Sequence, residues 1–237
     1  MQNQDHSCQQ QLEALRKEYE EFVYIVSHDL KAPLRAISNL SGWIKEDAGS
    51  QLDEETQHNL ELLQNRAERM ERMLNGLLLF SRATRQDLDV REVNVHDLVQ
   101  DLALPYQQER GLRLHLHNLP VFTTYAKKLE TVLHHLLQNA VKFNEQEQPE
   151  VWLEAREQEE SYLFTVRDNG VGIPPDAQEK VFKIFFSVQS RDQQENVGVG
   201  LSIIRKIIQF VGGTLHLHSE VGQGATFSFT WPKTVSA

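Results

Sequence analysis

A histidine and an aspartate stand side by side near the start of the chain, at His28 and Asp29. His28 lies two residues after Val26 and two before Leu30, and two residues turn a helix by about 200°. We therefore expect the imidazole nearly opposite the apolar residues, in solvent. An imidazole that is mostly uncharged at neutral pH has a lone pair for nucleophilic attack, and Asp29 can orient it and accept its proton. A lone exposed histidine is more often an ordinary surface residue.

A second set of residues is typical of a nucleotide site. Asn139 and Lys142 lie three apart on one expected helical face, where an amide oxygen can hold Mg²⁺ and an ammonium can meet phosphate. Asp168 ends an apolar strand, and its carboxylate can accept a hydrogen bond from the exocyclic amine of adenine. Gly170 and Gly172 would let the backbone approach the base. Each feature alone also fits a solvated helix face or an Asn-Gly turn.

Glycines return before a later helix. Gly198 and Gly200 precede the helix that begins near Leu201, and the free N–H groups at such a helix start can bind phosphate. The polar residues 187–197 before them can act as a mobile lid over the nucleotide. Phenylalanines can anchor that lid, although aromatic clusters are more often simple core. The expected anchors are Phe182, Phe185 and Phe186.

Two amphipathic helices are expected to hold His28. Apolar residues follow spacings of three and four over residues 12–44 and again over residues 60–77. Two helices joined by a short loop form an antiparallel hairpin, but a single hairpin cannot cover both apolar stripes. A twofold dimer that forms a four-helix bundle is therefore predicted.

Local signals refine this hairpin. Ser50, with Asp53 three residues on, can cap the second helix. Pro33 removes a backbone donor and crowds the carbonyl of Asp29, so the first helix is expected to bend just after the histidine.

Beyond Arg85 the pattern becomes mixed. Asn94 can cap a helix through about Gln108, and further helices are expected around residues 129–142 and 201–210. Alternating strand-like runs lie among them, namely RLHLH, VWLEA, LFTVRD, GTLHLHS and ATFSFTW. This order predicts an α/β two-layer sandwich with a mixed or antiparallel sheet and helices on one side.

The motifs, taken together, resemble those of one known family. SHDLKAPLRAI, residues 27–37, resembles the H-box of the sensor histidine kinases of two-component systems, especially the phytochrome-like branch. HLLQNAVKFN resembles the N-box, RDNGVGIP the G1 box, VFKIFF the F-box, VGVGLSI the G2 box, and GQGATFSF the last glycine motif. These five belong to the family's ATPase domain, whose fold certain chaperone and DNA-repair ATPases share. The resemblance runs from about Glu18 to Pro232, and five motifs in order behind an H-box are highly specific.

The resemblance implies a protein histidine kinase that uses ATP and Mg²⁺ to phosphorylate His28 and passes the phosphate to an aspartate of a separate response regulator. It implies that Asn139 holds the metal, that Lys142 meets phosphate, that Asp168 selects adenine and that Thr226 lies beside adenine. A threonine in a strand is otherwise simply a good strand former. The implied organisation is a helical linker from an upstream sensor (1–17), a dimerisation and phosphotransfer domain (18–86) and an ATP-binding domain (87–237).

Two positions depart from the family pattern. His135 stands where the family usually has the first N-box asparagine, which leaves the details of magnesium coordination open. Ala32 stands four residues after the histidine, where many relatives carry Thr or Asn to position a water for dephosphorylating their partner. Weak phosphatase activity is therefore predicted.

Composition and net charge limit the classes of binding partner and the cellular locations that we expect. The chain has 237 residues and a formal net charge of −10, which argues against nucleic acid or an anionic membrane surface as a main partner. Cys8 is the only cysteine, so a reducing compartment is favoured. No apolar run approaches the roughly 20 residues that cross a bilayer, and a cytoplasmic location is expected.

Two other functions stay open. The same fold can serve as a non-kinase ATPase that drives a conformational clamp, or as a nucleotide-binding scaffold that has lost catalysis. The H-box and the hairpin argue against the first, and only His135 favours the second. Only the kinase hypothesis predicts that His28→Gln loses a covalent phosphate while ATP binding is retained.

Overall fold

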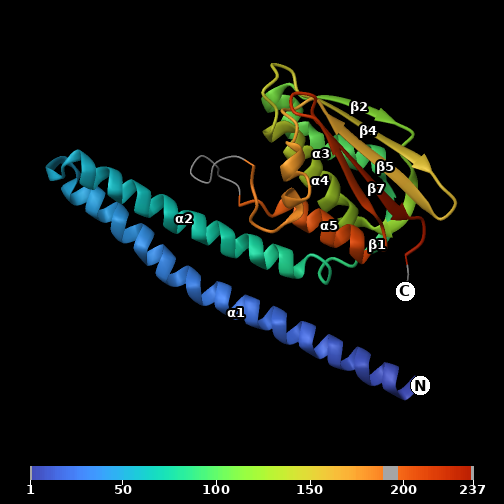
Figure 1. Ribbon diagram of the computed structural model, residues 1–237, viewed down its shortest axis with the longest axis horizontal. Coiled ribbons are helices and arrows are strands. Elements are labelled where there is room, and N and C mark those ends of the chain that lie inside the picture. The colour runs from blue at the N-terminus through green and yellow to red at the C-terminus, as the bar shows by residue number, and fades with distance from the viewer. Residues whose placement is uncertain (1, 189–196, 236–237) are drawn as a thin grey trace. The chain divides into compact units, whose positions relative to one another are not determined.

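The computed structural model describes residues 2–188 and 197–235, which fall into two compact units (Figure 1). The helices at the N-terminus form the first unit, which ends at Arg82, and the second unit begins at Ala83. The chain thus divides shortly before the boundary predicted at residues 86 and 87.

The first unit is a helical hairpin. Helix α1 spans Gln2–Ala48, the short 3₁₀ turn η1 spans Gly49–Gln51, and helix α2 spans Glu54–Arg82. Contacts between the helices run in antiparallel order: Arg82 lies over the ring of Tyr24, Arg35 pairs with Glu71, and Lys45 pairs with Glu61. Each step along α1 is matched by an equal step back along α2, so the register is antiparallel, as predicted.

Small residues line the contact between α1 and α2. Val23, Ser27, Leu34 and Ser41 of α1 are buried, and they face Ala67, Gly76 and Ser81 of α2. Short side chains let two helix backbones approach closely. Much of the apolar stripe predicted on α1 is exposed in the single chain, as expected for a hairpin that cannot cover both stripes by itself. Its exposed members are Leu15, Tyr19, Phe22, Leu30, Ile37, Leu40 and Ile44.

The start of α2 differs in detail from the local signals. The cap of α2 is Asp53 and not Ser50, because the Asp53 carboxylate accepts a hydrogen bond of 2.6 Å from the backbone N–H of Thr56. That hydrogen bond lowers the pKa of Asp53, as expected for an anion at a helix start. Helix α1 continues without a break through Pro33, and the bend expected after His28 stays a prediction.

The second unit is an α/β sandwich. Its strands are β1 (Val90–Asn94), β2 (Arg113–His117), β3 (Val121–Tyr125), β4 (Glu150–Glu157), β5 (Ser161–Asp168), β6 (Leu215–Ser219) and β7 (Ala225–Pro232). Its helices are α3 (Val95–Arg110), α4 (Ala126–Lys142) and α5 (Gly200–Phe210), with two short 3₁₀ helices, η2 (Pro175–Ala177) and η3 (Lys180–Phe182). All five predicted strands and all three predicted helices are present, and β1 and β3 lie outside the five predicted runs. Asn94 caps α3, as predicted, by accepting from His96 and Asp97.

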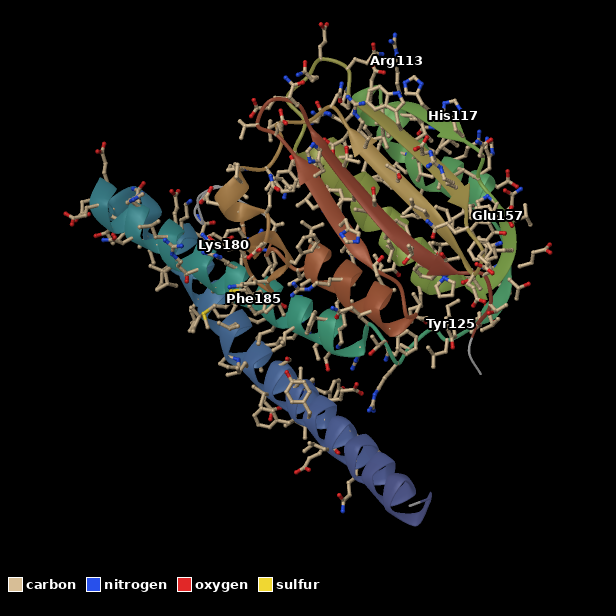
Figure 2. All side chains as sticks on the ribbon, turned by 45° about the vertical axis from the view of Figure 1, so that its right-hand side comes forward. Arg113, His117, Tyr125, Glu157, Lys180 and Phe185 are labelled. Atoms are coloured by element: carbon tan, nitrogen blue, oxygen red, sulfur yellow. The ribbon has the colours of Figure 1, made fainter. Side chains whose placement is uncertain are left out.

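Five strands form a mixed sheet in the order β2-β4-β5-β7-β6, in which only β2 and β4 are parallel. Helices α3, α4 and α5 all lie on one face of this sheet (Figure 1), as predicted, and Arg113 and His117 mark the two ends of its edge strand β2 (Figure 2). Strands β1 and β3 form a separate antiparallel pair. The core between layers consists of apolar residues from α4, α5 and the inner face of the sheet. Its largest fully buried members are Trp231, Phe164, Phe229, Leu129, Leu133, Leu136, Leu137, Leu153, Ile204, Ile207 and Ile208.

Candidate active site

His28 stands on the surface of the hairpin with its side chain 71% exposed, as predicted. Its Nδ1 lies 3.2 Å from Oδ1 of Asp29, whose side chain is equally exposed. An ionised carboxylate can only accept, so this hydrogen bond places the proton on Nδ1. The Nε2 lone pair is then available for attack on an electrophile. The structure therefore brings together the two residues predicted to be catalytic and distinguishes the roles of the two ring nitrogens.

Ala32 follows His28 by four residues on the same helix and offers no polar side chain to hold a water near that ring. Weak phosphatase activity therefore stays a prediction that rests on the residue type at position 32.

Asp168 is the centre of the predicted nucleotide site. It ends β5, is buried, and its Oδ1 accepts hydrogen bonds from the N–H groups of Gly170 (2.9 Å) and Ala225 (3.1 Å). Burial raises the pKa of Asp168, and the two N–H donors partly offset that rise. Among the residues that the structure describes, none donates to the other carboxylate oxygen. A buried acceptor of this kind is suited to a planar base that offers an amino group.

Loops from three parts of the chain join around Asp168. The N–H of Val171 donates to the carbonyl of Phe143, which follows α4, and the N–H of Gly222 donates to the carbonyl of Val171. Gly172 has a φ of 73°, and a Cβ there would stand 2.1 Å from the carbonyl oxygen of Glu220. Only glycine fits at such a position. The glycines predicted to bring backbone close to a base are thus required by the packing of these loops.

Asn139 and Lys142 lie near the end of α4. Asn139 is half-buried, whereas Lys142 is exposed and its Nζ lies 5.5 Å from the ring centre of Phe143. An amide oxygen beside phosphate groups fits Mg²⁺, which keeps several water and phosphate ligands. Across residues 2–188 and 197–235, no group of three His, Cys, Asp or Glu side chains is arranged to hold a metal ion.

His135, the residue that departs from the family pattern, lies at the contact of α4 with α5. Its Nδ1 would be 3.5 Å from a Cβ at Gly200, the first residue of α5. Burial, followed by the neighbouring His134, lowers the pKa of His135. The imidazole is thus held neutral beside the helix start that was predicted to bind phosphate.

Gly198 connects the start of α5 to the phenylalanine segment. Its φ is 72°, its carbonyl accepts from the N–H of Phe185, and a Cβ would stand 2.2 Å from the carbonyl oxygen of Phe186. Phe182 lies in η3, which packs against α5, with the guanidinium of Arg205 5.7 Å from its ring centre; Figure 2 labels Lys180 and Phe185, which bracket this segment. Most of the predicted lid, residues 187–197, lies outside the described residues.

Thr226 is not brought to Asp168. Along β7 the buried residues are Ala225, Phe227, Phe229 and Trp231, so Thr226 points to the opposite, open face of the sheet. It pairs there with Arg167, while the N–H of Ala225 reaches the Asp168 carboxylate. The predicted role of Thr226 beside adenine gains no support from this position.

A network of asparagines was missed by sequence reasoning. Nδ2 of the buried Asn144 donates to Oδ1 of Asn169, which also accepts from the N–H of Glu150. Asn169 donates in turn to the carbonyl of Gln148. The network fixes the loop after α4 to the loop after β5. The only sequence signal was the Asn-Gly pair at 169 and 170.

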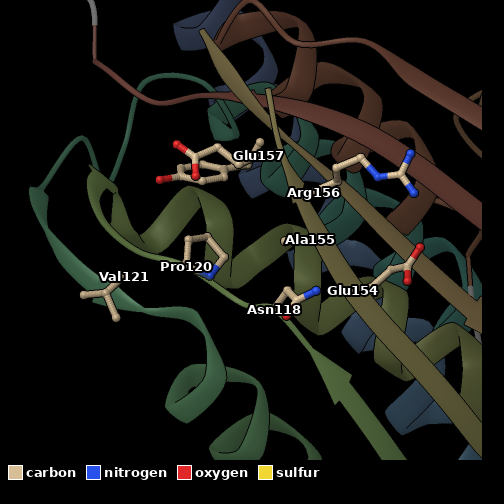
Figure 3. A pocket seen from close by; sticks show the side chains of 8 residues that line it. Asn118, Pro120, Val121, Glu154, Ala155, Arg156 and Glu157 are labelled. Atoms are coloured by element: carbon tan, nitrogen blue, oxygen red, sulfur yellow. The ribbon is translucent and has the colours of Figure 1, made fainter. Parts of the chain in front are cut away.

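A polar cavity lies elsewhere in the second unit. It measures about 550 Å³ and is lined by residues that include Asn118, Glu154 and Tyr162 (Figure 3). Tyr162 and Asp168 are at opposite ends of β5, so this cavity is separate from the nucleotide site.

Comparison with known proteins identifies a family for each of the two units. Residues 18–86 match the His Kinase A (phospho-acceptor) domain, and residues 124–235 match the histidine kinase-, DNA gyrase B-, and HSP90-like ATPase family. Cyanobacterial phytochrome B of Nostoc is 34% identical over 93% of this chain and 30% of its own length. The methanogenesis regulatory histidine kinase FilI of Methanothrix harundinacea is 32% identical over 94% of this chain and 25% of its own length. The chain thus spans less than a third of the length of these relatives.

Solved structures show the same architecture. The structure of full-length ShkA in complex with AMPPNP covers 92% of this chain and is itself covered to 46%, with a TM-score of 0.62 and 26% identity. Histidine kinase AdeS of Acinetobacter baumannii has a TM-score of 0.59 over 85% of this chain, at 16% identity, and so supports the fold alone. None of the helices that the structure describes has the length and apolarity needed to cross a bilayer. With a phosphoacceptor hairpin followed by an ATPase sandwich, the chain belongs to the sensor histidine kinases.

Proposed function

We propose that this chain is an ATP-dependent autokinase that phosphorylates His28. The observation that carries the proposal is the pairing, in one chain, of an exposed histidine hydrogen-bonded to Asp29 with a glycine-walled site around buried Asp168. Matches to both the phosphoacceptor and the ATPase families support it.

The nucleotide would bind by its base at Asp168, whose carboxylate accepts from the adenine amine. Gly198, Gly200 and Leu201 would offer backbone N–H groups to the phosphates at the start of α5, and Lys142 would add charge. Asn139 would supply one oxygen to a magnesium ion, which neutralises phosphate charge when bound. ShkA, whose structure contains AMPPNP, supports ATP as the nucleotide.

The transfer itself needs little covalent chemistry from the protein. Nε2 of His28 forms a bond to the γ-phosphorus in line with the bond from phosphorus to the β-γ bridging oxygen, which breaks and leaves ADP. The new positive charge on the imidazole is offset by Asp29, which accepts the Nδ1 proton as the base. The product is a phosphohistidine, which is a donor for a second phosphoryl transfer.

A homodimer formed through the hairpin is part of the proposal. One chain leaves an apolar face of α1 in solvent, with Phe22 63% and Leu40 53% exposed. The exposed members of the α1 stripe, together with Leu62, Leu63 and Met70 of α2, would be covered in a four-helix bundle.

We further propose a role in two-component signalling, with an upstream sensor on α1 and phosphate passed to an aspartate of a separate response regulator. Several relatives are named as sensor or regulatory proteins, among them the aerobic respiration control sensor protein ArcB of Escherichia coli. Ala32 in place of a water-positioning residue supports weak phosphatase activity toward that regulator.

The test is incubation with γ-labelled ATP and Mg²⁺, followed by assays for acid lability and alkali stability of the label. His28→Gln should abolish the label and keep nucleotide binding, whereas His58→Gln, which changes another exposed histidine of the hairpin, should leave it unchanged. No label on the wild-type chain despite nucleotide binding would favour the scaffold function. Release of inorganic phosphate without any label would favour a non-kinase ATPase.

A further inference from the structure

Three side chains form a stacked column at the phosphoacceptor. The rings of Tyr24 and His28 stack with centroids 6.1 Å apart and planes 28° from parallel. The guanidinium carbon of Arg82 lies 5.2 Å from the ring centre of Tyr24. Arg82 is the last residue of α2, so the column ties the end of that helix to the histidine.

The column supplies a contact that the Asp29 hydrogen bond lacks. Asp29 holds one edge of the imidazole through Nδ1 but leaves the ring free to rock about that bond. Tyr24 precedes His28 by four residues, a spacing that places two helical side chains on one face, and its ring is stacked beside the imidazole. A hydrogen bond at one edge and a stacked ring beside it together limit the directions in which Nε2 can point.

We infer that Tyr24 is a positioning residue for phosphorylation of His28, and that Arg82 holds Tyr24 in place from the end of α2. This inference rests on the proposed autokinase activity. Correct orientation of a nucleophile is a large part of in-line transfer, so a rocking imidazole should slow the chemical step and leave nucleotide binding unchanged.

A purely structural role for Tyr24 predicts something else. Tyr24 is 48% exposed, and an exposed stacked pair at this spacing adds little to the stability of a helix. Loss of the ring would then change neither the orientation of His28 nor the rate of transfer. Stability and rate therefore separate the two explanations.

The experiment uses the whole chain and four variants. Tyr24→Leu removes the ring, Tyr24→Phe keeps it, and Arg82→Met removes the cation above it. Trp43→Leu is the matched control, because Trp43 is another exposed aromatic residue of the same helix and is not one of the stripe residues. For each variant we would measure the autophosphorylation rate at saturating ATP and the KM for ATP. We would also record the imidazole ¹H and ¹⁵N resonances of His28 in histidine-labelled protein.

Tyr24→Leu should slow autophosphorylation by about 10-fold at unchanged KM and shift the His28 resonances, because the ring current of Tyr24 is lost. Tyr24→Phe should retain rate and resonances, and Arg82→Met should give a smaller change of the same kind. Unshifted His28 resonances in Tyr24→Leu, or equal slowing by Trp43→Leu, would overturn the inference. The resonances do not depend on kinase activity, so a failed autokinase proposal would show separately, as absence of label in every variant.

Discussion

The two units of this chain differ in which of their functional and apolar side chains they expose and which they bury. The hairpin keeps its reactive histidine and much of its apolar surface in solvent, and buries mainly small residues between its helices. The ATPase unit buries its central carboxylate, Asp168, beneath loops whose glycines are in backbone contact. A nucleophile that must meet several partners has to be reachable, whereas an acceptor that must select one base has to be enclosed. The difference supports the proposed dimer, in which a second copy would cover the exposed apolar face of the hairpin.

The strongest test of the enclosed site is Asp168→Asn. An amide in place of the carboxylate faces the two N–H donors with one fewer acceptor oxygen and presents its own donor to the base. We expect nucleotide affinity to fall by at least about 100-fold, because a buried polar mismatch is left unpaired. Calorimetric titration with ADP checks this, with Asp101→Asn on exposed α3 as control. Affinity within twofold of wild type would show that Asp168 does not select the base.

The incompleteness of the hairpin is tested next with Leu40→Asp. Leu40 is 53% exposed in one chain, so a charge there costs the monomer little, but it would be buried unpaired in a four-helix bundle. We expect the dimer to weaken by about 100-fold, as measured by light scattering across concentrations, with nucleotide binding unchanged.

Asn39→Asp is the matched control, since Asn39 is an exposed polar neighbour on α1. A Leu40→Asp protein that still dimerises like wild type would mean that this apolar face is covered in some other way.

A smaller effect is expected on the stability of the ATPase unit, where a buried lysine binds the segment at the start of this unit. Lys128 is only 3% exposed, and its Nζ donates to the carbonyl oxygens of Ala83 (2.7 Å) and Gln86. Lys128→Met should destabilise this unit by about 1–3 kcal/mol, because two carbonyls lose their donor. Lys127→Met, which loses only an exposed ion pair with Glu130, should cost far less.

Denaturant unfolding measures both variants, and hydrogen exchange at residues 83–87 should quicken only in Lys128→Met. Equal stability of the two variants would show that Lys128 is not a structural clamp on this segment.

The smallest expected effect is a pH dependence at His135. Its pKa is lowered in the folded unit, so as pH falls below the ordinary 6.5 the unfolded chain takes up a proton first. The free energy of unfolding should therefore fall between pH 6.5 and the lowered pKa of the folded state, and level off below it. His135→Asn should remove this part of the pH slope, whereas His216→Asn, at an exposed position of β6, should not. An unchanged slope in His135→Asn would assign the dependence to other groups.

Local patterns in the sequence correctly predicted most of the elements. Asn94 caps α3 because its side chain needs only the next few N–H groups, and the alternating runs form strands because their buried faces repeat every second residue. The prediction was wrong at the start of α2, which begins at Glu54, so that Asp53 and not Ser50 stands at its N-cap position. In β7 the alternation of the strand directs Ala225 inward and Thr226 outward, and the place of Thr226 beside adenine stays a prediction.

The sequence by itself determined which residue types could do chemistry, and in what order, because the motif residues lie within a few positions of one another. Only the tertiary structure decided which face of α1 meets α2, because close helix contact selects Ser27 and Ser41 over the larger apolar residues of the stripe. It also decided that Lys128 reaches Ala83 and that Arg82 reaches Tyr24. Those partners are far apart in sequence, and their contact depends on folding of the whole unit, which no local pattern can encode.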